Sequence, residues 1–387
     1  MTGAVLKFAS WDGAAWQVEV VDPAAPVGRW ASLGFDRAGN RLIAYADDGA
    51  GGLKLARGDG VSWSFETVDP AVSGTLHTSL RIDASDHPRV AYYDPAERDA
   101  RYARWDGTAW QLETVDRPGN VGRFTALVLD ASGAARIGYE DGSTSDLRLA
   151  AWDGSAWLFE TVDTAGRTGS AVDLALDPLG SPWLSYARTD DGTVRLARWD
   201  GVAWLLEVVA TPAFPAGIRT QLGFDGGGRP VLAYFDAAAD EVRVHWRDGA
   251  VWVPYVVQAT ADVGEENGFA FDAAGRPAAS YWDRSNDDLK LARWNGASWD
   301  LETVDAAGDV GRGSSLAFDA GSNPAVSYYD GDGGTLKFAR WDGSAWGFAT
   351  VDPTSLSGRE SALAFAPGGV PAIAYRHTSD RDLKYAL

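Results

Sequence analysis

Four short runs of alternating hydrophobic and polar residues recur along the chain, separated by residues typical of tight turns. In one copy the runs are SWDLETVD (298–305), SSLAFD (314–319), NPAVSYYD (323–330) and TLKFARW (335–341). A period of two is typical of strands, and no segment shows the 3.6-residue period of a helix. The Gly, Asn and Asp residues between the runs suit tight β-turns. The pattern therefore predicts an all-β protein.

An Asp-Gly turn measures the repeat, because its Asp recurs every 47 residues except for one step of 48. The turn position is occupied by Asp12, Asp59, Asp106, Asp153, Asp200, Asp248, Asn295 and Asp342. An aromatic residue follows four positions later in every copy, as Trp16, Trp63, Trp110, Trp157, Trp204, Trp252, Trp299 and Trp346. Four strands in each of eight repeats predict an eight-bladed β-propeller with four antiparallel strands per blade.

The SLAFD-type run suits the crowded innermost position of a blade, because it is short, apolar and rich in small residues. We name it strand A and the runs that follow it outward B (NPAVSYYD), C (LKFARW) and D (AWxxETVD). Strand A also occurs eight times, which favours eight blades over nine. We expect a single propeller domain over residues 1–387, with repeats at 6–52, 53–99, 100–146, 147–193, 194–241, 242–288, 289–335 and 336–382 and a partial copy at 383–387.

The two ends of the chain are expected to close the ring together, since the chain begins with strands C and D and ends with A, B and C. Two segments, Leu6–Ala9 and Leu383–Ala386, compete for the same C position. The sequence leaves open which of them completes the last blade. The surplus copy would be an exposed edge strand that favours dimerisation. Otherwise we expect a monomer.

Composition excludes several classes of site and partner. The chain contains no cysteine, which rules out disulfides and cysteine-based metal sites, and no cofactor is expected. A formal charge of −20 argues against nucleic acid and against an anionic membrane surface as partners. No apolar run approaches the length of a membrane-spanning helix. The first residues, MTGAVLKFASWDG, already belong to the repeat, so we expect no signal peptide in this chain.

The WDG-x-x-W motif at the C–D turn has two possible interpretations, one structural and one as a ligand site. Asp-Gly accepts the positive φ angles of a tight hairpin, and the Asp carboxylate can accept bonds from nearby backbone N–H groups. The flanking Trp residues would then fill the wedge between blades, each contributing roughly 2–3 kcal/mol by burial. The alternative is a sugar-stacking site on every blade. We favour the structural role, because a requirement of the fold explains all eight copies.

The motif also resembles a known family. An Asp-Gly turn with a Trp three residues beyond the Gly, between the third and fourth strands, looks like the Asp-box of sialidase-type (BNR) propellers. It departs from that pattern because Asp12 and Gly13 are adjacent, whereas the Asp-box has a residue between them. The whole SYYD…DLKYA-x-WDG-x-x-W unit resembles repeats of secreted bacterial and archaeal proteins. The 47-residue length and the Trp content resemble tachylectin-type propeller lectins.

The resemblance implies a propeller fold and an extracellular or cell-surface location. In such propellers the Asp-box turns lie on the face opposite the ligand. Binding would therefore belong to the D–A and B–C loops around the channel mouth. There the residue before strand A is an arginine in four repeats, namely Arg29, Arg123, Arg312 and Arg359. These side chains would form a partial ring for anionic ligands, or they would pair with the acidic B–C loops, which we favour.

The B–C loops carry many carboxylates, which raises the question of a metal. Oxygen ligands at this density suit Ca²⁺, and Asp330 and Asp332 are the weak candidates. No loop matches an EF-hand, so we favour solvated turn acids.

The most variable position on this face follows the arginine position and holds Trp30, His77, Phe124, Ala171, Arg219, Glu266, Gly313 and Glu360. Variation inside a strict repeat marks a place where the fold makes few demands. Trp30, His77 and Phe124 occupy successive repeats, and we expect them to form a binding patch.

Catalysis finds little support in the sequence. The four histidines fall in unrelated registers, and no nucleophile-elbow, zinc-protease or phosphate-loop motif occurs. For sialidase chemistry the arginine position and Glu265 or Glu266 are the only candidates, and no Tyr is placed with them. We therefore predict a non-enzymatic module that binds a protein or a carbohydrate. A sialidase-type glycoside hydrolase and a purely structural repeat are the alternatives.

Overall fold

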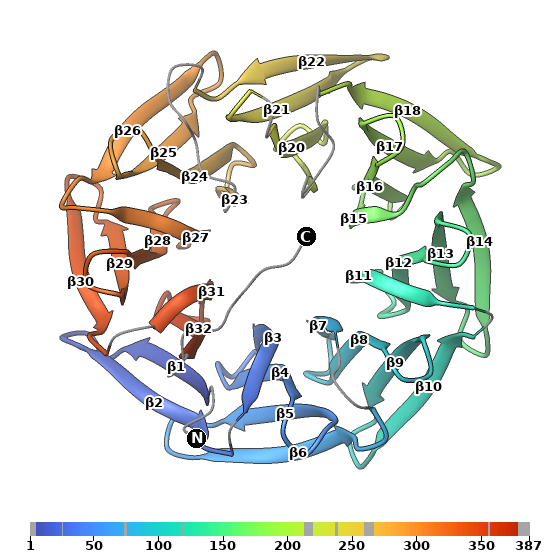
Figure 1. Cartoon of the computed structure of the whole chain (residues 1–387), viewed down its shortest axis with the longest axis horizontal. Helices are drawn as coiled ribbons and strands as arrows, with labels where there is room; N and C mark the ends of the chain where they lie inside the picture. Colours follow the sequence, from blue (N-terminus) through green and yellow to red (C-terminus); the bar gives the residue numbers. More distant parts are fainter. Residues whose placement is uncertain are drawn as a thin grey trace.

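The chain folds into a ring of eight four-stranded antiparallel sheets, which confirms the predicted eight-bladed propeller (Figure 1). The computed structural model describes residues 5–24, 26–72, 76–117, 119–212, 220–236, 239–258, 267–354 and 357–377. We number the blades in chain order: I (β3–β6), II (β7–β10), III (β11–β14), IV (β15–β18), V (β19–β22), VI (β23–β26), VII (β27–β30) and VIII (β31, β32, β1 and β2). None of the described segments forms a helix able to span a membrane.

The predicted A-to-D order runs from the channel outward in every blade (Figure 1). The innermost A strands are β3 (Val27–Phe35), β7 (Leu76–Ile82), β11 (Val121–Leu129), β15 (Ser170–Leu176), β19 (Thr220–Phe224), β23 (Gly268–Phe271), β27 (Val310–Phe318) and β31 (Ser357–Phe365). The B strands are β4 (Arg41–Asp47), β8 (Pro88–Asp94), β12 (Ala135–Asp141), β16 (Pro182–Arg188), β20 (Pro230–Asp236), β24 (Pro277–Asp283), β28 (Pro324–Asp330) and β32 (Pro371–His377).

The outer half of each blade is the hairpin that carries the WDG motif. Its C strands are β5 (Leu53–Gly58), β9 (Asp99–Trp105), β13 (Asp146–Trp152), β17 (Thr193–Trp199), β21 (Glu241–Asp248), β25 (Asp288–Trp294), β29 (Thr335–Trp341) and β1 (Val5–Trp11). Its D strands are β6 (Trp63–Asp69), β10 (Trp110–Asp116), β14 (Trp157–Asp163), β18 (Trp204–Ala210), β22 (Val251–Val256), β26 (Trp299–Asp305), β30 (Trp346–Asp352) and β2 (Trp16–Asp22).

The N-terminal copy of strand C closes the ring. β1 pairs with β32 over Val5–Ser10, and β2 completes the outer edge of blade VIII. Figure 1 shows the two ends of the colour scale meeting there, with β1 and β2 beside β31 and β32. The competing segment Leu383–Ala386 lies outside the described residues.

The hydrophobic core lies between neighbouring blades rather than within them. Leu42 and Leu55 of blade I, for example, cluster with Leu80, Val90 and Tyr92 of blade II. Each interface therefore buries one face of two sheets, as blade-to-blade packing requires. Equivalent clusters fill the other interfaces.

A buried polar link recurs at these interfaces. The hydroxyl of Tyr92 in strand B donates to the carboxylate of Asp69, which ends strand D of the preceding blade, at 2.7 Å. Arg101 of strand C approaches the same carboxylate at 3.7 Å. The same tyrosine–aspartate bond joins Tyr45, Tyr139, Tyr186, Tyr328 and Tyr375 to Asp22, Asp116, Asp163, Asp305 and Asp352.

Candidate functional site

The D–A and B–C loops lie on one face of the ring and are hydrogen-bonded to each other. The Asp48 N–H donates to the Pro26 carbonyl at 3.0 Å, and the Gly331 N–H donates to the Asp309 carbonyl at 2.7 Å. This face, which we call the mouth face, also contains the starts of the A strands. The WDG turns lie on the opposite face, the turn face.

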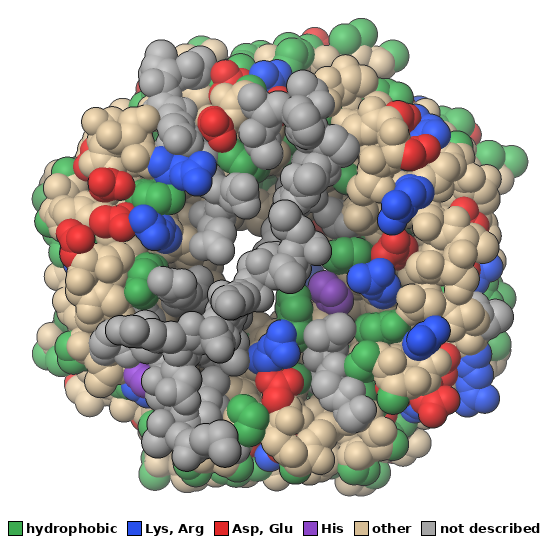
Figure 2. All heavy atoms as spheres, viewed as in Figure 1, with side chains coloured by type: hydrophobic (Ala, Val, Ile, Leu, Met, Phe, Trp, Pro, Cys, Tyr) green, Lys and Arg blue, Asp and Glu red, His purple; other side chains and the backbone are tan. Residues whose placement is uncertain are grey.

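The aromatic candidates Trp30, His77 and Phe124 come together at the mouth face as one row, which we call the aromatic row. The Trp30 and His77 ring centroids are 4.5 Å apart, and those of His77 and Phe124 are 4.8 Å apart. All three side chains are half-buried. Figure 2 shows hydrophobic side chains, a histidine and cationic side chains gathered beside the central opening, over the A strands of blades I to III.

The backbone of the aromatic row is unusual, because all three residues adopt left-handed conformations. Their φ angles are 55° at Trp30, 59° at His77 and 55° at Phe124. A bulge between the A and B strands imposes this conformation, as shown by the register shift between Arg29 and Ser32. Bulky residues rarely adopt such angles, and a strained residue costs about 1–3 kcal/mol.

Blade VII shows what the fold alone would choose at this position. Its equivalent residue is Gly313, with φ 59°, and glycine adopts this conformation without a steric penalty. Three bulky aromatic residues therefore occupy a position that suits glycine.

Neighbouring A strands hold the row in place through backbone contacts. The Thr78 hydroxyl of blade II donates to the Trp30 carbonyl, and the Thr125 hydroxyl of blade III donates to the His77 carbonyl. The indole Nε1 of Trp30 is buried without a hydrogen-bond partner among the described residues. The row is thus anchored by its backbone, and its rings also contact one another.

The three arginine candidates that the structure describes have different surroundings. Arg312 pairs with Asp309 at 2.6 Å and lies 4.1 Å above the Trp282 ring. Arg29 approaches Asp48 only at 3.9 Å. Arg123 is exposed, and its guanidinium lies 5.8 Å from the centroid of the Phe124 ring. The Arg359 side chain lies outside the described residues. Arg29 and Arg123 therefore flank the aromatic row, whereas Arg312 belongs to a separate cluster.

The acids that end the B strands stabilise the B–C turns. Asp47 accepts bonds from the Gly49 and Ala50 N–H groups at 3.0 and 2.8 Å, and its carboxylate lies 2.7 Å from Lys54. Burial raises the pKa of Asp47, but Lys54 and the two backbone donors outweigh burial and lower it overall.

The metal candidates Asp330 and Asp332 make bonds of the same kind. Asp330 accepts the Gly333 N–H at 3.0 Å, and Asp332 accepts the Asp309 N–H at 3.1 Å. Within the described ranges, no three His, Asp or Glu side chains are grouped so as to hold a metal ion.

The WDG motif builds a turn and joins two blades. The Asp12 carboxylate accepts the Ala14 and Ala15 N–H groups, both at 2.8 Å. These backbone donors lower the pKa of Asp12. The equivalent Asp59, Asp106, Asp153, Asp200 and Asp342 do the same, and Asn295 accepts equivalent bonds through its side-chain oxygen. Asp248 is instead the last residue of β21 and pairs with Val251.

The second Trp of the motif donates its indole N–H to a glutamate on strand D of the preceding blade. Trp110 reaches Glu66 at 2.6 Å, and Arg57 binds the other oxygen of that carboxylate at 2.6 Å. Trp63, Trp157, Trp204, Trp252 and Trp346 bind Glu19, Glu113, Glu160, Glu207 and Glu302 in the same way.

The two other motif Trp residues lack this acceptor. The indole nitrogens of Trp16 and Trp299 are buried without a partner in the described part of the chain. The corresponding positions on the preceding D strands hold Ala349 and Tyr255. The glutamate is therefore the acceptor that the sequence reasoning missed, and its recurrence in the ETVD run was the available signal.

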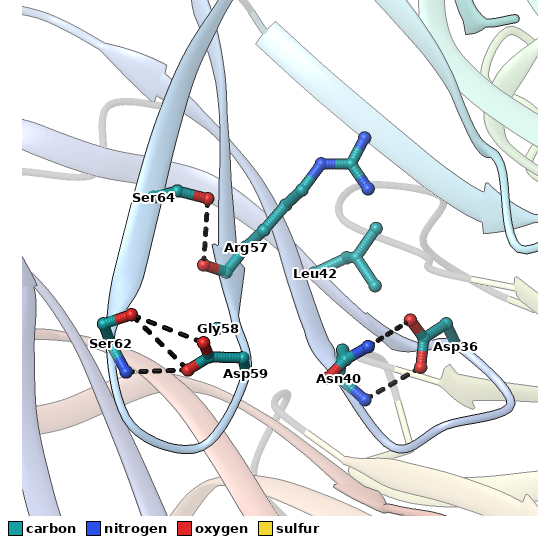
Figure 3. Close-up of a pocket in the computed structure, with 8 residues that line it drawn as sticks. All are labelled: Asp36, Asn40, Leu42, Arg57, Gly58, Asp59, Ser62 and Ser64. Carbon is teal, nitrogen blue, oxygen red and sulfur yellow. Dashed lines mark hydrogen bonds between the residues drawn. The ribbon is translucent and has the colours of Figure 1, made fainter. Parts of the chain in front are cut away.

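A hollow lies on the turn face of blade I, with a volume of about 220 Å³ (Figure 3). Its wall includes Leu42, Arg57 and Gly58. Blade II carries the larger Arg89 and Trp105 where blade I has Leu42 and Gly58. Asp36 and Asp59 point to their own turns and bind Asn40 and Ser62 there (Figure 3). The hollow is thus a local gap in the repeat.

Comparison with solved structures identifies other propellers. A prolyl endopeptidase is similar with a TM-score of 0.55 at 11% identity, over 91% of this chain and 55% of that one. An ulvan lyase gives a TM-score of 0.51 at 14% identity, over 90% and 91% of the two chains. The fucose-specific lectin of Aleuria aurantia gives 0.43 at 15% identity, over 71% and 96%. No protein-family model and no curated protein sequence matches the chain. At these identities the likeness extends to the propeller fold.

Proposed function

We propose that this propeller is a non-enzymatic binding module whose ligand, a carbohydrate, docks on the mouth face at the aromatic row. One observation carries the proposal: Trp30, His77 and Phe124 adopt left-handed backbone conformations at a position where Gly313 stands in blade VII. Strain of this kind persists where function requires it. The strain supports the interpretation that these three side chains are retained for binding, because the fold itself would be better served by glycine.

The surroundings of the row suit a carbohydrate. Sugar rings present apolar C–H faces that contact aromatic side chains, and their hydroxyls accept hydrogen bonds. The row supplies aromatic surface across three blades. The exposed Arg29 and Arg123 beside it supply N–H donors without an ion pair shorter than 3.9 Å among the described residues. A few directed polar groups around an apolar platform are typical of ligand sites.

The test is a glycan array read with the wild-type protein and with Trp30→Gly and Phe124→Gly. Glycine is used because it adopts the local φ angle without strain, so the variants should fold. Loss of binding in both variants is expected. Phe348→Ala is the matched control, since Phe348 is 52% exposed on the outer strand of blade VII.

Equal glycan binding by wild type and both glycine variants would remove this site. If the wild-type protein binds no glycan but binds a protein through the aromatic row, the ligand is a protein and not a carbohydrate. Turnover of a fluorogenic sialoside would favour the hydrolase alternative. A purely structural repeat predicts no ligand-induced shift in Tm.

A further inference from the structure

The central channel contains a hollow at its turn-face end. The hollow measures about 360 Å³, which is within the range of small-molecule sites. Its wall is formed by Arg81, Ile82, Val128, Leu129 and Leu176. Ile82, Leu129 and Leu176 are the last residues of β7, β11 and β15, so the hollow spans three A strands. The aromatic row lies at the opposite ends of the first two of these strands.

Charge is rare on this inner wall. The last five residues of each A strand, such as Ala31–Phe35, are uncharged in all eight blades except for Arg81 and Asp173. The position of Arg81 holds only Gly, Ala or Val in the other seven blades. The repeat therefore does not need an arginine there, and the fold offers it an apolar environment.

The guanidinium of Arg81 retains unused donors. Its Nη1 donates to the Leu80 carbonyl at 2.8 Å, and the side chain is exposed to the channel. No carboxylate of the described residues lies within ion-pair distance of it. Arg89, directly opposite on β8, is bound to Asp83 at 2.5 Å, so its charge is already balanced. Among the described residues Arg81 thus has no ion-pair partner, and Asp173 acts on its charge only from beyond ion-pair distance.

Asp173, the one acid on this wall, is engaged elsewhere. Its carboxylate accepts the Leu222 N–H of the next blade at 2.8 Å and the Leu174 N–H at 2.9 Å. Ser32 and Ser79 bind the next blade's backbone from the equivalent position in blades I and II. Asp173 therefore replaces a structural serine. Burial raises its pKa, although Arg81 and the two N–H groups act in the opposite direction.

We propose that this hollow binds a small organic carboxylate with a compact apolar body. The planar Arg81 guanidinium pairs with the carboxylate, for which its donor geometry is matched. Ile82, Val128, Leu129 and Leu176 contact the apolar body. The site is independent of the carbohydrate site, since the two share no residue.

Calorimetric titration with cyclohexanecarboxylate tests the site, with cyclohexanecarboxamide as the neutral probe of similar shape. We expect saturable binding of the carboxylate, no detectable binding of the amide, and at least a tenfold loss of carboxylate affinity in Arg81→Gln. The control is Arg37→Gln, which removes an exposed arginine from an A–B turn on the same face and should bind as wild type does. Melting curves establish that each variant is folded.

Several outcomes would overturn the proposal. Identical titrations of wild type and Arg81→Gln would remove the site, and so would a carboxylate titration that does not saturate. If acetate binds as tightly as cyclohexanecarboxylate, the apolar side chains of the hollow contribute nothing to binding. Trp30→Gly should leave carboxylate binding intact, so a failure of the carbohydrate proposal does not affect this result.

Discussion

At the scale of single residues, the most informative position is the one that varies among the blades. The A-strand bulge imposes a positive φ angle there, and Trp30, His77 and Phe124 accept it although only glycine does so without strain. The backbone conformation at this position suits glycine, so the aromatic side chains there are not explained by the fold.

Phe124→Gly is expected to be more stable than Phe124→Ala by about 1–2 kcal/mol, because alanine in a left-handed conformation carries a Cβ clash that glycine lacks. Chemical denaturation of both variants measures the difference. At Val128, four residues along the same strand, φ is not positive, and the order should reverse, with alanine the more stable. Equal stabilities of the Phe124 pair would contradict the left-handed assignment.

His245 is a second single-residue departure from the repeat. The equivalent position is a buried alanine in the other seven blades. His245 is 4% exposed, its ring stacks on Tyr234 at 5.5 Å, and neither ring nitrogen has a partner among the described residues. Burial, with a smaller contribution from Arg243, lowers the pKa of His245 to about 4.

The stability of the protein should therefore fall on mild acidification. Between the unfolded pKa near 6.5 and the folded pKa of about 4, the unfolded chain binds a proton that the folded chain does not. The contribution is fully present above pH 6.5, and roughly 3 kcal/mol is lost as the pH falls to 4. In His245→Ala this part of the slope should vanish in denaturation curves from pH 7 to 4. An unchanged slope would place the titrating group elsewhere.

At the scale of elements, the blades are joined by polar bonds between one blade's outer hairpin and its neighbour's. The indole of a WDG-x-x-W motif binds a glutamate of the preceding D strand in six blades, and that acceptor is missing opposite Trp16 and Trp299. A buried donor without a partner costs about 1–3 kcal/mol. The two blade interfaces at Trp16 and Trp299 are therefore expected to be less stable than the other six.

Restoring the acceptor should stabilise the ring. In Ala349→Glu the new carboxylate can accept the buried Trp16 N–H and approach Arg340, as Glu66 does with Trp110 and Arg57. We expect a gain of about 1 kcal/mol in the free energy of unfolding, measured by urea denaturation. Phe348→Glu, at the adjacent exposed position, adds the same charge without reaching the indole and should show no such gain. Similar effects of both substitutions would assign the gain to charge alone.

At the scale of the whole molecule, stability depends on closing the ring. Blade VIII is assembled from both ends of the chain, with β1 between β2 and β32. The Lys7 ammonium adds a buried ion pair to Asp352 of blade VII at 2.6 Å. Both contacts are made by the N-terminal copy of strand C, which occupies this place in the ring.

A crosslink can verify this closure in a protein that has no cysteine of its own. Val5 and His377 are directly paired across β1 and β32, at a separation that a disulfide can bridge. Oxidised Val5→Cys/His377→Cys is expected to form the bond and to raise Tm, because the bond restricts the unfolded chain. Val5→Cys/Ala374→Cys, three residues out of register, should not crosslink. Failure of the first pair would favour closure by the other segment.

The sequence pattern was sufficient to predict much of the fold but little of the candidate site. Alternation and Asp-Gly turns predicted the strands, because they reflect chemistry within a few residues. The 47-residue spacing predicted the number of blades, because each repeat supplies one blade. Binding at the D–A and B–C loops, which the resemblance implied, stays a prediction. The pairing of Arg312 with Asp309, over the Trp282 ring, could not be predicted from the repeat. Such pairing depends on loop geometry that the repeat does not encode.

The sequence alone determined that this chain is an eight-bladed, four-stranded propeller, because periodicity and turn chemistry are local properties. Tertiary structure decided which strand closes the ring, which glutamate six of the motif Trp residues reach and which arginine faces the channel with no ion-pair partner among the described residues. Trp110 and Glu66 are separated by 44 residues and meet only when two blades pack. Contacts of that kind depend on how neighbouring sheets stack. The repeat predicts that blades stack, but it does not predict which side chains meet.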